Sequence, residues 1–355
     1  MISPESPEGL PDFHKGRALT LALVITVLSL IGVGVAITAL QPDTAPWQAV
    51  KVLLLQANFS LLIGGMLAMS LGMLFVAIRW RCLLPDKEGI PPFGLTGIIC
   101  SGLLLNYALP GPAGEVAGAY LVKERYKKPA TVALAASLHA RLIGLGTAGL
   151  LAGLVGLFCD LPIPPEHRFK LGIAIGIIAT GAAGVGILSA FPGLLAWLSE
   201  HTVGALARRI KGGIGKSLSA LNSAVCGVAK GLGQVSRLGI GAYVQATGWA
   251  ILAHLFVFLG IVLACKAMGI SPYLPGILLS YCAATASVVA LIAFPGSQIG
   301  WDLLLVAFLQ FTAGLDSAEA WAVVVLVRAQ QLFLLVIGAG FLVHYSRDLA
   351  TPDRT

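Results

Sequence analysis

The stretch LLLNYALPGPAGEVAGAY, residues 103–120, breaks an apolar segment with prolines and glycines and places an acid, Glu115, just past the break. A second apolar segment is broken in the same way by FPGSQIGWDLL, residues 294–304. Non-helical backbone is tolerated at membrane depth only where protein or a water-filled cavity satisfies its polar groups. Each segment, 93–122 and 275–315, is therefore predicted to be a re-entrant hairpin of two half-helices. Two full helices joined by a surface turn are the alternative.

The composition is that of a membrane protein. Hydrophobic residues make up 57% of the chain and charged residues 11%, whereas soluble domains carry about 25% charged residues. A hydrocarbon core of ~30 Å needs ~20 apolar residues per helix. We therefore expect an all-α polytopic membrane protein with about six spanning helices besides the two hairpins. The expected spans are 18–40, 55–78, 130–157, 170–190, 240–264 and 319–343.

The basic residues predict the orientation, because cytoplasmic loops carry an excess of Lys and Arg. With the N-terminus in the cytoplasm, 17 of the 23 Lys and Arg fall on the cytoplasmic side, Arg79 and Arg81 among them. This holds only if both hairpins return to the side that they left. The sequence thus predicts cytoplasmic N- and C-termini in the cytoplasmic (inner) membrane of a bacterium or archaeon.

We expect one transmembrane domain, residues 14–345. Its first apolar run is expected to be a span rather than a secretory signal peptide, because the run is too long and lacks a clear cleavage site. The linker between the repeats carries six basic residues against one acid, Glu200, with leucines between them. This pattern is typical of amphipathic helices lying on the inner leaflet, although a solvated linker is the alternative for the Gly-rich part. The other expected segments are a disordered tail at 1–13, a first repeat at 93–157, the basic linker at 193–239, a second repeat at 275–343 and a C-terminal tail at 346–355.

The two hairpins belong to an internal repeat that carries buried charges. Glu115 precedes Arg141 by 26 residues, and Asp302 precedes Arg328 by the same number. In the predicted topology the two arginine-bearing spans run in opposite directions. Inverted repeats with discontinuous helices are typical of transporters whose site lies at the repeat interface near the membrane midplane.

These charges support two hypotheses. Charged side chains at bilayer depth cost at least ~2.5–3.5 kcal/mol each, so they persist where they are paired or functional. The planar fork of arginine suits phosphate, and helix N-termini present free N–H groups, so an anionic-headgroup site is one hypothesis. Two structural salt bridges that lock the hairpins are the other. The predicted substrate-binding residues are Arg141, Arg328, Glu115, Asp302, Asn106, Gly111, Gly114, Gly296, Ser297 and Gln298.

Other polar side chains lie in the same regions. His139 and His254 could titrate, or could be hydrogen-bonded core histidines. The amides and hydroxyl of Gln310, Gln330, Gln331 and Tyr107 could line a wet cavity or satisfy broken backbone. The sequence contains no metal-ligand cluster, nucleophile–base arrangement or CxxC pair, so we expect neither a metal nor another cofactor, and no enzymatic activity.

At these motifs the chain resembles the lysylphosphatidylglycerol-synthase transmembrane-region family, a flippase-like integral membrane domain. The resemblance covers about 15–345, and it is carried by 103–146, by FPGSQIGWDLL and by AWAVVVLVRAQQLFLLVIGAG. It implies six or more spans with re-entrant hairpins, frequent dimers, and movement of lipids between leaflets. The best-known members add a cytoplasmic aminoacyl-transferase, which is not expected here, so lipid aminoacylation is not expected either. Asp302 is a departure, because a glutamate is expected there in the family.

Together these features predict a flippase- or scramblase-like transporter of an anionic phospholipid, an aminoacyl lipid or a polyprenyl-linked lipid. A secondary transporter of a small anion and a non-transporting scaffold for a lipid-modifying enzyme are the alternatives. The expected partners are membrane lipids, with a homodimer and a lipid-modifying enzyme as further options. Nucleic acid is not expected, because the basic residues flank spans and form no soluble module.

The predicted topology can be tested by cysteine labelling in a background without the native cysteines. Lys127→Cys should react only with a membrane-permeant maleimide, because it follows the first hairpin on the cytoplasmic side. Lys266→Cys should react with an impermeant maleimide added outside. Labelling of both positions from outside would contradict a first hairpin that returns to the cytoplasm.

Overall fold

The computed structural model describes residues 47–108, 113–163, 191–210, 212–291 and 297–350, with scattered positions between 168 and 184. These parts of the chain are helical apart from short connections. Their helices are α2 (Trp47–Gln56), α3 (Phe59–Cys82), α4 (Pro92–Ala108), α5 (Ala113–Tyr126), α6 (Ala130–Phe158), α8 (Pro192–Ser199), the π-helical turn η1 (Glu200–Gly204), α9 (Ala205–Arg209), α10 (Gly213–Val235), the 3₁₀ turn η2 (Ser236–Leu238), α11 (Ile240–Ala267), α12 (Leu274–Leu291), α13 (Ser297–Ala313) and α14 (Ser317–Ala350).

Four of the described helices, α3, α6, α11 and α14, are long and apolar enough to cross a membrane. They coincide with four of the predicted spans, which confirms an all-α, multi-pass membrane protein. The predicted span 18–40 lies outside the described residues, and 170–190 is described only at scattered positions. The total of about six spans therefore stays a prediction.

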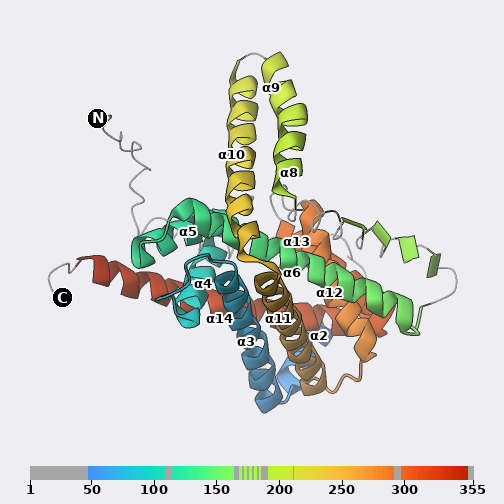
Figure 1. Ribbon diagram of the computed structural model, residues 1–355. Coiled ribbons are helices and arrows are strands. Elements are labelled where there is room, and N and C mark those ends of the chain that lie inside the picture. The colour runs from blue at the N-terminus through green and yellow to red at the C-terminus, as the bar shows by residue number, and fades with distance from the viewer. Residues whose placement is uncertain are drawn as a thin grey trace, which may run out of the picture.

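Helices α3 and α11 form the closest pair and lie side by side (Figure 1). Gly65 of α3 lies against the backbone of Gly260 in α11, an approach that small residues permit in lipid. Toward the C-terminal end of α3, the ring of Phe75 stacks on that of Trp249 in α11, with ring centroids 5.5 Å apart. The start of α3 is fixed by Asn58, whose side-chain oxygen accepts the free N–H groups at the helix N-terminus.

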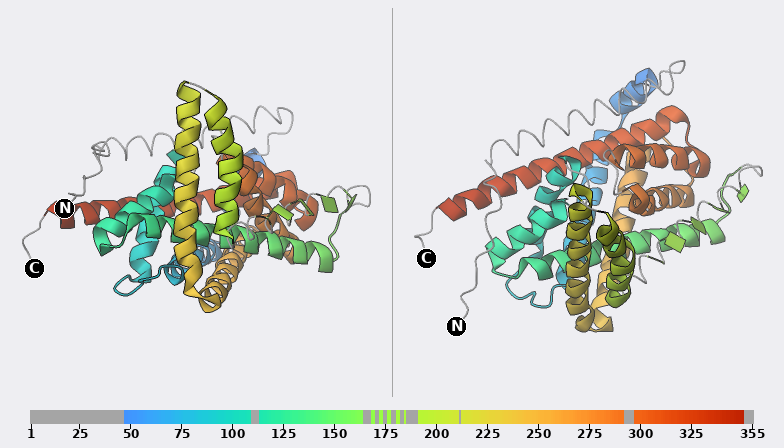
Figure 2. Two further views of the ribbon diagram at one scale, coloured as in Figure 1. Left: turned by 45° about the horizontal axis from the view of Figure 1, so that its top comes forward. Right: turned by 90° about the horizontal axis from the view of Figure 1, so that it is seen from above.

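Helices α6 and α14 both pack against this pair and cross it steeply (Figures 1 and 2). They run in opposite directions: in Figure 1 α6 runs from left to right, and α14 returns from right to left. Opposite directions are what an inverted repeat requires. The inversion with respect to a membrane stays a prediction.

Both broken segments are helix pairs, α4–α5 and α12–α13, whose helices pack on one another. In the first pair, the side-chain oxygen of Asn106 accepts the N–H of Gly114 at 2.6 Å, which joins the end of α4 to the start of α5. In the second pair, the hydroxyls of Ser280 and Thr312 lie 2.8 Å apart, where α12 crosses α13 at Gly276. Whether the pairs are re-entrant hairpins or cross the membrane stays a prediction.

The basic linker 193–239 folds into two helical arms, α8–η1–α9 and α10, which project from the body at the top of Figure 1. The hydroxyl of Ser199 donates to the side-chain oxygen of Asn222 at 2.8 Å and ties the arms together. Helical arms are as predicted, and their contact with the inner leaflet stays a prediction.

Gly276→Ala should destabilise the second helix pair. A Cβ at this position would overlap the carbonyl oxygen of Thr312, and overpacking of this kind costs about 1–3 kcal/mol. We expect a lower melting temperature in detergent. Gly248→Ala in α11 is the matched control, because nothing lies within 4 Å of its Cβ, and it should leave the melting temperature unchanged or raise it. Equal melting temperatures for Gly276→Ala and the parent protein would contradict this packing.

Candidate functional site

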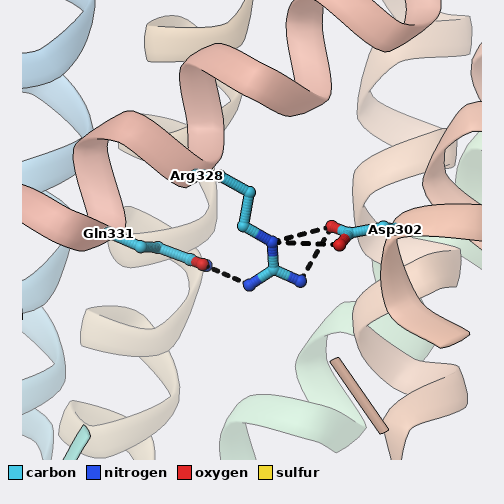
Figure 3. A network of polar contacts seen from close by, with 3 residues as sticks. All are labelled: Asp302, Arg328 and Gln331. Atoms are coloured by element: carbon cyan, nitrogen blue, oxygen red, sulfur yellow. Dashed lines mark hydrogen bonds and ion pairs between the residues drawn. The ribbon is translucent and has the colours of Figure 1, made fainter. Parts of the chain in front are cut away.

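The second acid–arginine pair is fully buried and held from several sides (Figure 3). Asp302 comes from α13 and Arg328 from α14. The Nε atom of Arg328 donates to both carboxylate oxygens of Asp302 at 2.9 and 3.1 Å, and Nη2 lies 2.8 Å from Oδ1. Nη1 donates to the side-chain oxygen of Gln331, and the guanidinium lies 5.3 Å from the ring centre of Trp301. Such a multidentate pair is rigid as well as neutral.

The first pair is looser, although its sequence spacing is the same. Nη1 of Arg141 in α6 binds Oε1 of Glu115 in the first turn of α5, and Oε2 of Glu115 is buried without a hydrogen-bond partner among the described residues. The side chains of Arg141 and Glu115 are 27% and 13% exposed, against 9% and 1% for Arg328 and Asp302. The two pairs are thus unequal: Arg328 and Asp302 form the locked pair, with several contacts and little exposure, whereas Arg141 and Glu115 share one contact and are more exposed.

A cavity of about 270 Å³ lies where the two repeats meet. Its walls come from α3, α4, α6, α11, α12, α13 and α14, so both helix pairs and both arginine-bearing spans contribute. Among the described lining residues none is acidic. The polar side chains that line it are Arg79, Arg141, His254, Tyr281, Thr285, Gln330 and Gln331.

Arg79 lines the cavity but was not among the site residues predicted from the sequence. The charge pattern groups it with Arg81 at the cytoplasmic surface, but its side chain is turned into the protein and only 6% of the residue is exposed. Two residues along a helix rotate the side chain by about 200°, which separates Arg79 from Arg81; Arg81 instead donates to the carbonyl of Ile90. A count of charges does not distinguish the faces of a helix, so the sequence did not show that Arg79 is buried; its assignment to the cytoplasmic side stays a prediction.

The two predicted histidines differ in their surroundings. Nε2 of His254 lies 2.9 Å from the carbonyl oxygen of Gly144, which only accepts, so Nε2 carries the proton. Nδ1 lies 3.3 Å from the hydroxyl of Tyr281, which donates to Nδ1 when the ring is neutral. His139 is buried with its ring edge-to-face against Tyr243 and does not line the cavity.

The remaining predicted residues divide into three groups. Asn106 and Gly114 bond to one another, so the N–H of Gly114 already has a partner within the protein. Gln330 and Gln331, which were predicted either to line a cavity or to satisfy backbone, line the cavity. Gly111 and Gly296 lie outside the described residues, and only the backbone of Ser297 and Gln298, at the start of α13, is described.

Fold and site together define a multi-pass helical membrane protein with a cationic cavity between two broken helix pairs. The model of one protein family, described as the lysylphosphatidylglycerol synthase TM region, matches residues 18–339. The chain belongs to this family, as its motifs had indicated. Neither a comparison with curated proteins nor one with solved structures gave a match.

The unequal pairs predict unequal coupling energies. Asp302→Ala and Arg328→Ala should each destabilise the protein strongly, because removing one partner of a buried pair costs about 3–5 kcal/mol. The double variant should lose less than the sum of the two. The same thermal-unfolding cycle on Glu115 and Arg141 should give a smaller coupling, and an equal or larger one would contradict the assignment of the locked pair.

Proposed function

We propose that this protein is a flippase-like transporter that moves an anionic lipid between the leaflets, with the headgroup bound in the cavity between the two helix pairs. The family supports a lipid-related membrane function. The observation that carries the proposal is the cavity itself, which contains the side chains of Arg79 and Arg141 and no acid among its described lining residues. A cationic, low-dielectric pocket inside an apolar bundle favours an anion.

The size of the cavity limits what enters it. Pockets for drug-sized ligands measure ~300–1,000 Å³, so about 270 Å³ accommodates a headgroup but not acyl chains. The chains would stay in the hydrocarbon while the headgroup passes between the repeats. This division suits a lipid whose polar part is small, such as a glycerol-phosphate headgroup.

The two pairs take different roles in this proposal. Arg141 lines the cavity and has a single contact with Glu115, so it can turn toward a phosphate when a headgroup arrives. Arg328 does not line the cavity, and it holds Gln331 and Trp301, which do, in a fixed arrangement. Asp302 then serves the structure by neutralising Arg328.

Several further properties belong to the same proposal. We propose transport rather than catalysis, in one domain of residues 14–345, in a cytoplasmic membrane with both termini inside. Re-entry of both helix pairs would place the cavity near the membrane midplane, as expected for inverted repeats. A homodimer or a lipid-modifying enzyme would be compatible partners.

A small soluble anion is the second candidate cargo, since the cavity volume would also suit an ion with a few waters. It differs from a lipid in needing a route from water rather than from the side of the bundle. Transport assays with lipid and soluble cargo separate the two.

The proposal is tested with fluorescent short-chain phosphatidylglycerol in proteoliposomes, using dithionite to quench the outer leaflet. Arg141→Gln should slow the exchange of inner-leaflet lipid at least tenfold, because the cavity loses a headgroup contact. Lys123→Gln removes an exposed charge and should transport as the parent protein does. If Arg141→Gln or empty liposomes exchange lipid as fast as the parent protein, the proposed site is wrong.

A further inference from the structure

Arg79 and Arg328 are buried among the described helices and Arg141 is partly buried, and the three differ in how their charge is balanced. Arg328 is neutralised by Asp302, and Arg141 by Glu115. Arg79 forms no ion pair with the described part of the chain, and its buried Nε has no hydrogen-bond partner there. An unpaired guanidinium in an apolar interior is costly. An arginine of this kind at a cavity wall indicates that its charge is balanced by a bound anion rather than by a side chain of the protein.

The position of Arg79 is built into the surrounding helices. Its guanidinium lies against Gly144 of α6, where a Cβ would collide with Nη1, so a larger residue at 144 would displace it. Gly144 follows Arg141 by three residues, which puts both on one helix face. Arg79 and Arg141 therefore converge on the same cavity from α3 and α6.

The charges of the cavity set the charge of the ligand. Each acid–arginine pair is internally neutral, and both hydrogen bonds of His254 are compatible with a neutral ring. Arg79 alone contributes a net charge of about +1 to this region. One negative charge balances it, whereas a dianion would leave an excess negative charge. No acidic side chain among the described lining residues is available for a ligand ammonium group.

We propose that Arg79 is the primary anion-binding residue and that it selects a phosphodiester, a phosphate group with one negative charge and no attached cation. The inference deepens the proposed function and rests on it only in assigning the phosphodiester to a lipid. The fork of the guanidinium binds two phosphate oxygens, and Arg141 contributes a second contact through guanidinium nitrogens that do not bind Glu115. A phosphodiester could also belong to a soluble molecule, and the two sources are separable by experiment.

Binding is measured by isothermal titration calorimetry on the full chain in detergent, with dihexanoylphosphatidylglycerol as the lipid probe. Its deacylated form, glycerophosphoglycerol, is the soluble probe with the same phosphodiester. Arg79→Gln should weaken binding of the lipid probe at least tenfold, and Arg79→Lys should weaken it less, since a point charge remains without the fork. Arg208→Gln, which removes an exposed arginine of α9, should bind as the parent protein does. The zwitterionic dihexanoylphosphatidylcholine should bind at least tenfold more weakly than the lipid probe.

Thermal unfolding distinguishes binding from a purely structural role. Without ligand, Arg79→Gln should melt at the same or a higher temperature than the parent protein, because an unbalanced charge is removed. A structural arginine would give a lower melting temperature. Gly144→Ala keeps the charge but displaces the guanidinium, so it should also weaken binding of the lipid probe.

The outcomes separate this inference from the lipid proposal. Binding of both phosphodiesters with equal loss in Arg79→Gln would keep the role of Arg79 and overturn a lipid-specific cargo. Unchanged binding in Arg79→Gln, a destabilised Arg79→Gln variant, or no binding of either phosphodiester to the parent protein would overturn the role of Arg79, whatever the result of the lipid-transport assay.

Discussion

The burial of guanidinium groups in an apolar bundle is the constraint on which the rest of this structure depends. Burial limits the hydration of these charges, so an opposite charge from protein or cargo lowers their cost. Arg328 has a rigid carboxylate, an amide and an aromatic ring around it. Arg141 has a single ionic contact, and Arg79 has none within the described chain. This gradation, from locked to exchangeable to unbalanced, gives the interior both a stable frame and a place for an anion.

Broken helices provide the geometry that this arrangement needs. A helix that ends inside the bundle leaves N–H groups without partners, and the side chain of Asn106 accepts one of them at the start of α5. Glu115 in the first turn of α5 is favoured by the same helix end and reaches Arg141 from there. The break, the cap and the ion pair are thus one local unit. Close contacts at Gly276 and Gly65 bring the neighbouring helices near enough to enclose the cavity.

The proposed transport depends on a small cavity inside the bundle that carries an unbalanced positive charge. In the proposed function, the positive charge of the cavity would attract a phosphate, and its apolar lining and volume of about 270 Å³ would exclude acyl chains. An exchangeable contact at Arg141 keeps binding reversible, which transport requires. The contacts of Arg328 hold Gln331 and Trp301, which line the cavity, in place. An anion that left the cavity toward either leaflet would restore the same unbalanced state.

The sequence by itself determined the class of protein, four long apolar helices, the two broken segments and the pairing of Glu115 with Arg141 and of Asp302 with Arg328. These conclusions rest on composition, hydropathy and the equal spacing of the acid–arginine pairs, which can be read from the sequence without knowledge of the fold. Only the tertiary structure decided that the two pairs are unequal and that Arg79 lines the cavity beside Arg141. Those facts depend on which face of each helix meets its neighbours, and helix packing fixes that face through contacts far apart in sequence.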